Sequence, residues 1–155
     1  MSFKFNQSIF RAIILVCVIA LAGCATPVKH ATMSGKPEVT IHGASKSSVK
    51  ERLVSEMVNR GYTPNKADDT ILSFDRPITD AMASMFLGSG YDSQPNARIV
   101  YTLVKNKDAV RVIADCAVIT NPHSAFERRS DMNQAQETTK IQAMLDSVKA
   151  DLGRK

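Results

Sequence analysis

Apolar and polar residues alternate most regularly between residues 98 and 120. A period of two is typical of β-strands, because successive side chains of a strand point to opposite faces. Turn-forming residues 106–108 interrupt the alternation once, which predicts a β-hairpin of the segments 98–105 and 109–120. The regular apolar sets are Ile99, Tyr101 and Leu103 in the first segment and Val110, Val112, Ala114, Cys116 and Val118 in the second. The inward face of this hairpin is expected to form the core.

A period of three to four residues predicts two amphipathic helices. The apolar face of the first helix comprises Val49, Leu53, Val54, Met57 and Val58. A serine at 45, 47 or 48 is expected to cap its N-terminus, and Gly61 to follow its C-terminus. The second helix is expected to begin near Asn133 and to end at Gly153. Its stripe comprises Ile141, Met144, Leu145, Val148 and Leu152.

Shorter segments complete the pattern. Residues 38–42 alternate and predict a strand, residues 62–66 predict a strand or an extended lead-in, and residues 70–76 predict a strand that Pro77 ends. Residues 121–131 are expected to form an irregular loop. The fold class is therefore α+β: a small, mostly antiparallel sheet with two amphipathic helices packed on one face. The opposite face would be only partly polar, which suggests that something covers it.

The N-terminal segment has the pattern of a targeting signal. Lys4 and Arg11 precede an apolar run over residues 12–22, which is 11 residues long. A helix that spans a bilayer needs about 20 apolar residues, whereas the apolar part of a signal peptide needs roughly 7 to 15. Residues 1–23 are therefore predicted to be a cleaved signal peptide.

The end of this segment resembles the lipobox of bacterial lipoproteins. The matching residues are Leu21, Ala22, Gly23 and Cys24, with small side chains at 22 and 23 and a thiol at 24. The resemblance implies that a signal peptidase recognises residues 21–23, and that Cys24 becomes the first mature residue and carries three acyl chains, palmitate among them. It covers residues 1–24 only. The alternative is an ordinary secretory signal followed by an unrelated cysteine.

The residue after Cys24 bears on the membrane that holds the protein. Ala25 stands where an Asp favours retention in the inner membrane of enterobacteria. A lipid-anchored protein on the periplasmic face of the outer membrane is therefore expected, with the inner membrane as the alternative. Residues 24–37 are predicted to be the lipidated cysteine and a flexible tether that spans on the order of 20 Å. Residues 38–155 are then a single periplasmic domain.

Composition limits the number of domains, the class of partner and the chemistry open to the cysteines. Without residues 1–23 the chain has 132 residues, enough for one domain, and its net charge falls from +5 to +3. This charge does not demand nucleic acid, which an exported protein would rarely meet, so no nucleic-acid partner is expected. Cys17 leaves with the signal and Cys24 takes the lipid, so Cys116 has no cysteine with which to form an internal disulfide. Cys116 is expected to be a buried, inert thiol.

No catalytic or cofactor-binding constellation is evident, and the chain is predicted to be neither an enzyme nor a metalloprotein. His30, His42 and His123 do not have the spacing of metal ligands. Motifs for nucleophilic hydrolysis, phosphate binding and dinucleotide binding are absent from the sequence. Asp68, Asp69 and Asp75 could hold a cation, but adjacent Asp residues in a turn more often cap the local backbone.

The strongest candidate for function is a methionine-rich segment between two predicted strands. Met82, Met85, Phe86, Leu87 and Tyr91 are the candidate partner-binding residues. Methionine and aromatic side chains adapt well to partner surfaces. The alternative is a short helix over 78–87 that covers the sheet with a core stripe. Arg128 and Arg129 could contact phosphate headgroups or lie in a solvated loop.

Three functions follow from these observations. The first is a protein-interaction or assembly module that binds another envelope protein, and residues 48–75 are similar in outline to a repeat domain of barrel-assembly and secretion lipoproteins. The second is a binder of a lipid or other apolar ligand in a cavity between helices and sheet. The third is an envelope hydrolase, which would need convergent polar side chains in a cleft. The sequence specifies neither the partner nor the oligomeric state.

Overall fold

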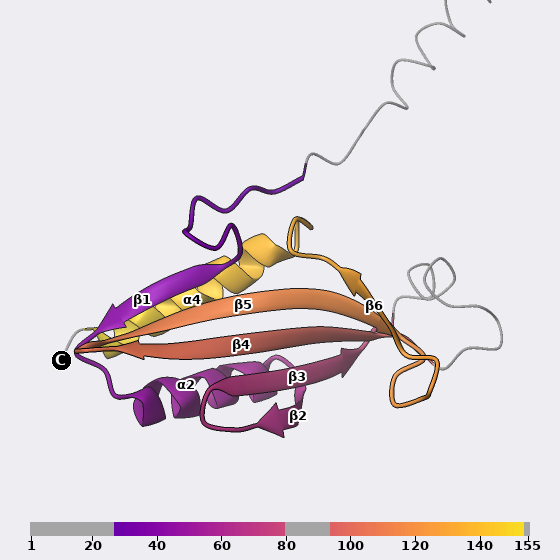
Figure 1. Cartoon of the computed structure of the whole chain (residues 1–155), viewed down its shortest axis with the longest axis horizontal. Coiled ribbons are helices and arrows are strands. Elements are labelled where there is room, and N and C mark those ends of the chain that lie inside the picture. The colour runs from indigo at the N-terminus through magenta and orange to yellow at the C-terminus, as the bar shows by residue number, and fades with distance from the viewer. Residues whose placement is uncertain (1–26, 80–93, 154–155) are drawn as a thin grey trace, which may run out of the picture.

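The computed structural model describes residues 27–79 and 94–153, and confirms the predicted α+β fold (Figure 1). Its elements are β1 (Glu38–His42), α2 (Lys46–Asn59), β2 (Thr63–Ala67), β3 (Ile71–Pro77), β4 (Asn96–Asn106), β5 (Ala109–Thr120), β6 (Arg128–Asp131) and α4 (Thr138–Leu152). The lipobox and the methionine-rich residues Met82, Met85, Phe86, Leu87 and Tyr91 lie outside the described residues, so the predictions made for them remain predictions.

The strands form one six-stranded sheet in the order β1-β5-β4-β3-β2, and every pairing is antiparallel. The hairpin of β4 and β5 lies at its centre, as the alternation predicts. Short strands β1 and β6 share the outer side of β5, where β1 pairs with residues 109–113 and β6 with residues 117–120. β2 forms the opposite edge of the sheet.

Strand β6 corrects the sequence prediction, which assigned residues 121–131 to an irregular loop. All four residues of β6 are exposed, so no side chain of this strand contributes to an apolar face. A strand without alternation gives no periodic signal. Pairing with β5 alone places these residues in the sheet.

Helix α2 begins as predicted. The side chain of Ser45 accepts a hydrogen bond from the Ser48 N–H at 3.0 Å, which selects Ser45 among the three candidate caps. The helix ends at Asn59, and Gly61 follows with φ +78°, a conformation that favours glycine. The residues of α2 that are fully enclosed are Val49, Leu53 and Met57, which share one face. Val58, which the sequence pattern placed on the same apolar face, is instead 50 % exposed.

Helix α4 begins at Thr138, five residues after the predicted start near Asn133. Asn133 resembles a helix cap in sequence, but its side chain bonds to β5 instead. The chain then turns twice before the helix, because the N–H of Ala135 donates to the Met132 carbonyl and that of Thr138 to the Ala135 carbonyl. The end of the helix agrees with the prediction, with Gly153 as its C-cap.

The core lies between the helices and one face of the sheet. It contains the predicted inward residues Ile99, Tyr101, Leu103, Val110, Val112, Ala114 and Cys116, together with Val49, Leu53, Met57, Met144, Leu145 and Val148 from the helices. Val118, also predicted to point inward, is buried but lies outside this cluster. At its centre the Tyr101 and Phe74 rings meet edge to face, with 6.0 Å between centroids. Enclosing one such large apolar side chain contributes roughly 1.5–3 kcal/mol to folding.

Figure 1 looks onto the sheet with α2 and α4 behind its strands. The helices contact each other, and Arg52 of α2 pairs with Asp151 of α4 at 2.8 Å. Both described helices thus lie on one face, as predicted, and leave the opposite face of the sheet without a helix from the described part of the chain. Within residues 27–79 and 94–153, neither helix is long and apolar enough to cross a bilayer.

Candidate interaction surface

The sheet face opposite the helices carries apolar side chains at its centre. Cross-strand register places Ile71 beside Thr102 and Thr102 beside Ile113, with Val100 and Val104 one step away on the same face of β4. We call Ile71, Val100, Thr102, Val104 and Ile113 the outer strip. All five are at least partly accessible to solvent, and Val104 is 45 % exposed. Folding therefore leaves apolar surface here unburied.

A bidentate ion pair borders the outer strip on one side. Arg98 donates from Nε to Asp75 Oδ1 at 2.7 Å and from Nη2 to Asp75 Oδ2 at 2.8 Å. Asp75 is only 7 % exposed, and Asn65 also donates to its Oδ2. The same guanidinium reaches Glu127 Oε1 at 2.8 Å. Hydrogen bonds to Asp75 raise the pKa of Arg98, against the opposing effect of its partial burial.

A second bidentate pair lies near the other end of the strip. Arg111 donates from Nε to Glu38 Oε1 at 2.6 Å and from Nη2 to Glu38 Oε2 at 2.8 Å. These hydrogen bonds lower the pKa of the Glu38 carboxyl more than burial raises it. The pair joins β1 to β5, whose residues 38 and 111 are 73 positions apart in the sequence.

A third group of charges surrounds Asp115 of β5. Arg129 and Lys36 reach its two oxygens at 2.8 Å and 3.2 Å, and Asn133 donates to Oδ1 at 2.7 Å. Partial burial raises the pKa of Asp115, but the bonds from Asn133 and Lys36 and the charge of Arg129 outweigh it, so that the pKa is lowered overall. Arg129 thus pairs with a carboxylate, and Arg128 is exposed beside it.

These three groups of charged residues have one feature in common. Glu38, Asp75 and Asp115 are each paired with an arginine of the sheet, and Asp115 also with Lys36. The outer strip therefore lies among paired charges whose hydrogen bonds are already made. When a partner displaces water from such a surface, these charges are buried as pairs, so little cost arises from unpaired charge.

Two of the edge strands, β1 and β2, discourage contact by strand addition. At β1, the Gln142 side chain accepts from the Glu38 N–H and donates to the Glu38 carbonyl, at 2.8 Å and 3.2 Å. At β2, Pro64 lacks a donor, the register shifts between Pro64 and Lys66, and all five residues are exposed. Pro, Lys and bulges are the features by which natural edge strands avoid pairing with other chains. A partner is therefore better accommodated on the face of the sheet than at these edges.

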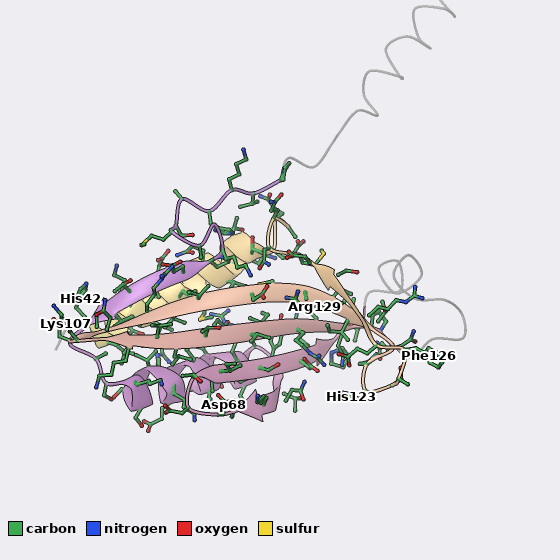
Figure 2. All side chains as sticks on the ribbon, in the orientation of Figure 1. His42, Asp68, Lys107, His123, Phe126 and Arg129 are labelled. Atoms are coloured by element: carbon green, nitrogen blue, oxygen red, sulfur yellow. The ribbon has the colours of Figure 1, made fainter. Side chains whose placement is uncertain are left out.

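The loop between β5 and β6 presents a further apolar group. Phe126 is 78 % exposed, yet its N–H donates to Ser124 Oγ at 3.1 Å and the adjoining Glu127 accepts from the His123 N–H at 3.0 Å. Figure 2 shows His123 and Phe126 at one end of the sheet, and His42 and Lys107 at the other. Sequence reasoning assigned Phe126 no role, because a single aromatic in a polar loop has no periodic signal.

The described residues that flank the methionine-rich segment lie at the same end of the sheet. Ile78 donates from its N–H to the Pro95 carbonyl at 2.9 Å and accepts from Gln94 Nε2 at 3.0 Å. Asn96, the first residue of β4, pairs with Pro77 on one side and Ile119 on the other. The described residues on both sides of the segment are therefore held together, one strand away from the end of β5 that leads to Phe126.

The carboxylates considered for a cation are separated in the structure. Asp68 Oδ1 accepts from the N–H groups of Thr70 and Ile71 at 3.1 Å and 2.7 Å, Asp69 pairs with Lys46, and Asp75 pairs with Arg98. The local backbone cap is thus the arrangement observed at Asp68, which Figure 2 labels beside β2. In the part of the chain that the structure describes, no three His, Cys, Asp or Glu side chains are grouped to hold a metal ion.

A hollow on the outer side of α2 bears on the hypothesis of an apolar ligand. Its described lining residues are Ser47, Lys50, Glu51, Val54, Ser55, Val58 and Asn59. All belong to α2, and four of them are exposed polar residues. The hollow thus lies outside the helix–sheet layer, where Met57 and Met144 pack into the core rather than line a space open to solvent.

Comparisons with protein-family models and with curated proteins find no match for this chain. Function is therefore inferred from the fold, the outer strip and the N-terminal sequence.

Proposed function

We propose that this protein is a lipid-anchored envelope protein that binds another envelope protein through the outer strip, as an interaction or assembly module. The observation that carries the proposal is the two-faced sheet. One face is covered by α2 and α4, while the other keeps accessible apolar side chains among internally paired charges. An apolar centre bordered by charges that are already paired suits contact with a protein surface that is itself apolar at its centre and polar at its rim.

The N-terminal sequence supports the anchor. Leu21, Ala22, Gly23 and Cys24 follow an apolar run of signal-peptide length and match the lipobox. Three acyl chains would hold the protein stably, since each buried methylene contributes about 0.8 kcal/mol. Ala25 favours the periplasmic face of the outer membrane as the location, with the inner membrane as the alternative. An anchor of this kind keeps the outer strip close to other envelope proteins.

The methionine-rich segment would extend this surface. Met82, Met85, Phe86, Leu87 and Tyr91 belong to the chain that connects β3 to β4 at the end of the sheet where Phe126 is exposed. Methionine, phenylalanine and tyrosine supply adaptable apolar contacts. The segment and the outer strip together would present more contact area than either alone.

A pair of exposed valines tests the proposal. Val104 belongs to the outer strip and Val58 to α2, and the two are 45 % and 50 % exposed. Val104→Lys is expected to dissociate a complex seen when the protein is extracted from membranes in mild detergent and separated by size. Val58→Lys is the matched control and should leave the complex intact. Equal behaviour of the two variants contradicts a role for the outer strip.

A further inference from the structure

Residues 28–36, which the sequence assigns to a flexible tether, contact the domain in the structure. The Val28 N–H donates to the Gln134 carbonyl at 2.9 Å, and His30 Nε2 lies 2.8 Å from Thr138 Oγ1. We call residues 28–36 the strap. Figure 1 shows it running along the β1 side of the sheet.

The far end of the strap is held by charge. Lys36 pairs with Asp115 at 3.2 Å, and the Ser34 N–H donates to Glu38 Oε2 at 3.1 Å. The next residue also joins the sheet, since the Pro37 carbonyl accepts from the Ala114 N–H at 2.8 Å. The strap is therefore fixed to α4 at its beginning and to β5 at its end.

The strap is also folded within itself. Its Gly35 N–H donates to the Thr32 carbonyl at 3.1 Å, and Thr32 Oγ1 donates to the Lys36 carbonyl at 2.6 Å. Gly35 has φ +68°, which favours glycine at this turn. Residues 28–36 thus behave as part of the domain surface and not as an extended linker.

We infer that the strap fixes which edge of the domain faces the membrane. The inference rests on the proposed lipid at Cys24. Val28 is four residues from Cys24, and four residues span at most about 14 Å. A chain this short would hold the β1–β6 edge and the start of α4 against the bilayer surface, and would direct β2 away from it.

This orientation indicates where a partner of the outer strip would be located relative to the membrane. The outer strip lies on the sheet face, at right angles to the edge that holds the strap, so it would open parallel to the membrane surface. A protein embedded in the same membrane, or bound at its surface, can meet the strip from the side. A partner held far from the bilayer would meet β2, whose five residues are all exposed and which is blunted by Pro64.

Energy transfer to labelled lipid tests the orientation. The acylated full chain, with the buried thiol removed by Cys116→Ala, is inserted into vesicles of phosphatidylethanolamine and phosphatidylglycerol that carry a headgroup acceptor. A donor dye is placed by Lys140→Cys, on the first turn of α4, or by Thr63→Cys, on β2; both positions are exposed. Higher transfer from position 140 than from position 63 is expected. A double variant, His30→Ala with Lys36→Ala, should abolish that difference.

The results of this experiment distinguish the proposed orientation of the domain from the proposed role of the strap. Equal transfer from the two positions in the anchored protein overturns the orientation, and a difference that survives the double variant overturns the role of the strap. Absence of acyl chains on Cys24 by mass spectrometry contradicts the proposed anchor itself.

Discussion

Asn133 and Cys116 are 17 positions apart, and the side-chain oxygen of Asn133 accepts the main-chain N–H of Cys116 at 2.8 Å. Cys116 belongs to the part of β5, residues 114–116, that pairs with neither β1 nor β6. Beside it, the Cys116 carbonyl accepts from the Met132 N–H at 2.9 Å, and the Asn133 amide donates to Asp115 and Asp131. One buried side chain therefore replaces strand pairing across the gap between two edge strands.

The first prediction concerns this bond. Asn133→Leu is expected to lower the free energy of unfolding by about 1–3 kcal/mol, because the buried Cys116 N–H loses its acceptor. Urea denaturation measures the change. Asn59→Leu, an exposed substitution at the end of α2, is the control and should change stability by about 0.5 kcal/mol or less. Similar losses in the two variants would show that Asn133 has no special role.

The second prediction concerns acid sensitivity. Hydrogen bonds from Arg111 hold the pKa of Glu38 below its ordinary value despite burial. A carboxyl with a lowered folded-state pKa stabilises the fold at pH values above its unfolded pKa, and this contribution is lost as the pH falls through the folded pKa. Glu38→Gln should therefore lose less stability than the native protein between about pH 5 and pH 2.

Urea midpoints measured across this pH range test the expectation. Glu51→Gln, on the exposed side of α2, controls for the general effect of acid. A Glu38→Gln profile parallel to that of the native protein would mean that the pair with Arg111 contributes nothing to the acid sensitivity.

The third prediction concerns the remaining thiol. Burial, helped by the charges of Asp115 and Asp131, raises the pKa of Cys116 to about 12. The thiolate is the reactive form, so Cys116 should not react with iodoacetamide at neutral pH in the folded protein. In urea the same thiol should react at the rate of a free cysteine. A form with both Cys17→Ser and Cys24→Ser has Cys116 as its one thiol, and rapid labelling of that folded protein would contradict its burial.

The fourth prediction concerns processing and sorting. Cys24→Ser is expected to abolish incorporation of labelled palmitate and to release the protein from membranes, since the thioether cannot form. Ala25→Asp should keep the lipid and move the protein toward the inner-membrane fraction of an enterobacterial host. Palmitate incorporation that persists in Cys24→Ser would rule out the lipobox assignment.

Periodic signals made most of the fold predictable. Alternation located β4 and β5, and the three-to-four period with a serine and a glycine located α2. The structure differs where a residue serves a distant partner. β6 has four exposed side chains, Asn133 bonds to β5 instead of capping α4, and the strap contacts the domain through residues typical of a linker.

The outer strip was foreseen only as a partly polar second face. Its borders depend on ion pairs such as Arg98–Asp75 and Arg111–Glu38, whose partners are 23 and 73 positions apart. Spacing in a single sequence carries no sign of such pairs, because strand order and register decide them. Phe126 was missed as an interaction residue for a related reason, since its exposure depends on how Ser124 and Glu127 fold the loop.

Photo-crosslinking in cells tests the central claim, that the outer strip binds an envelope protein, most directly. A photoreactive phenylalanine analogue would replace Val104, Val58 as the matched control, or Met85 in the methionine-rich segment. We expect one discrete protein adduct from position 104, none from position 58, and loss of the adduct in a Cys24→Ser form. No adduct from position 104 in a fully anchored, well-expressed protein, or equal adducts from positions 104 and 58, would contradict the proposed interaction surface.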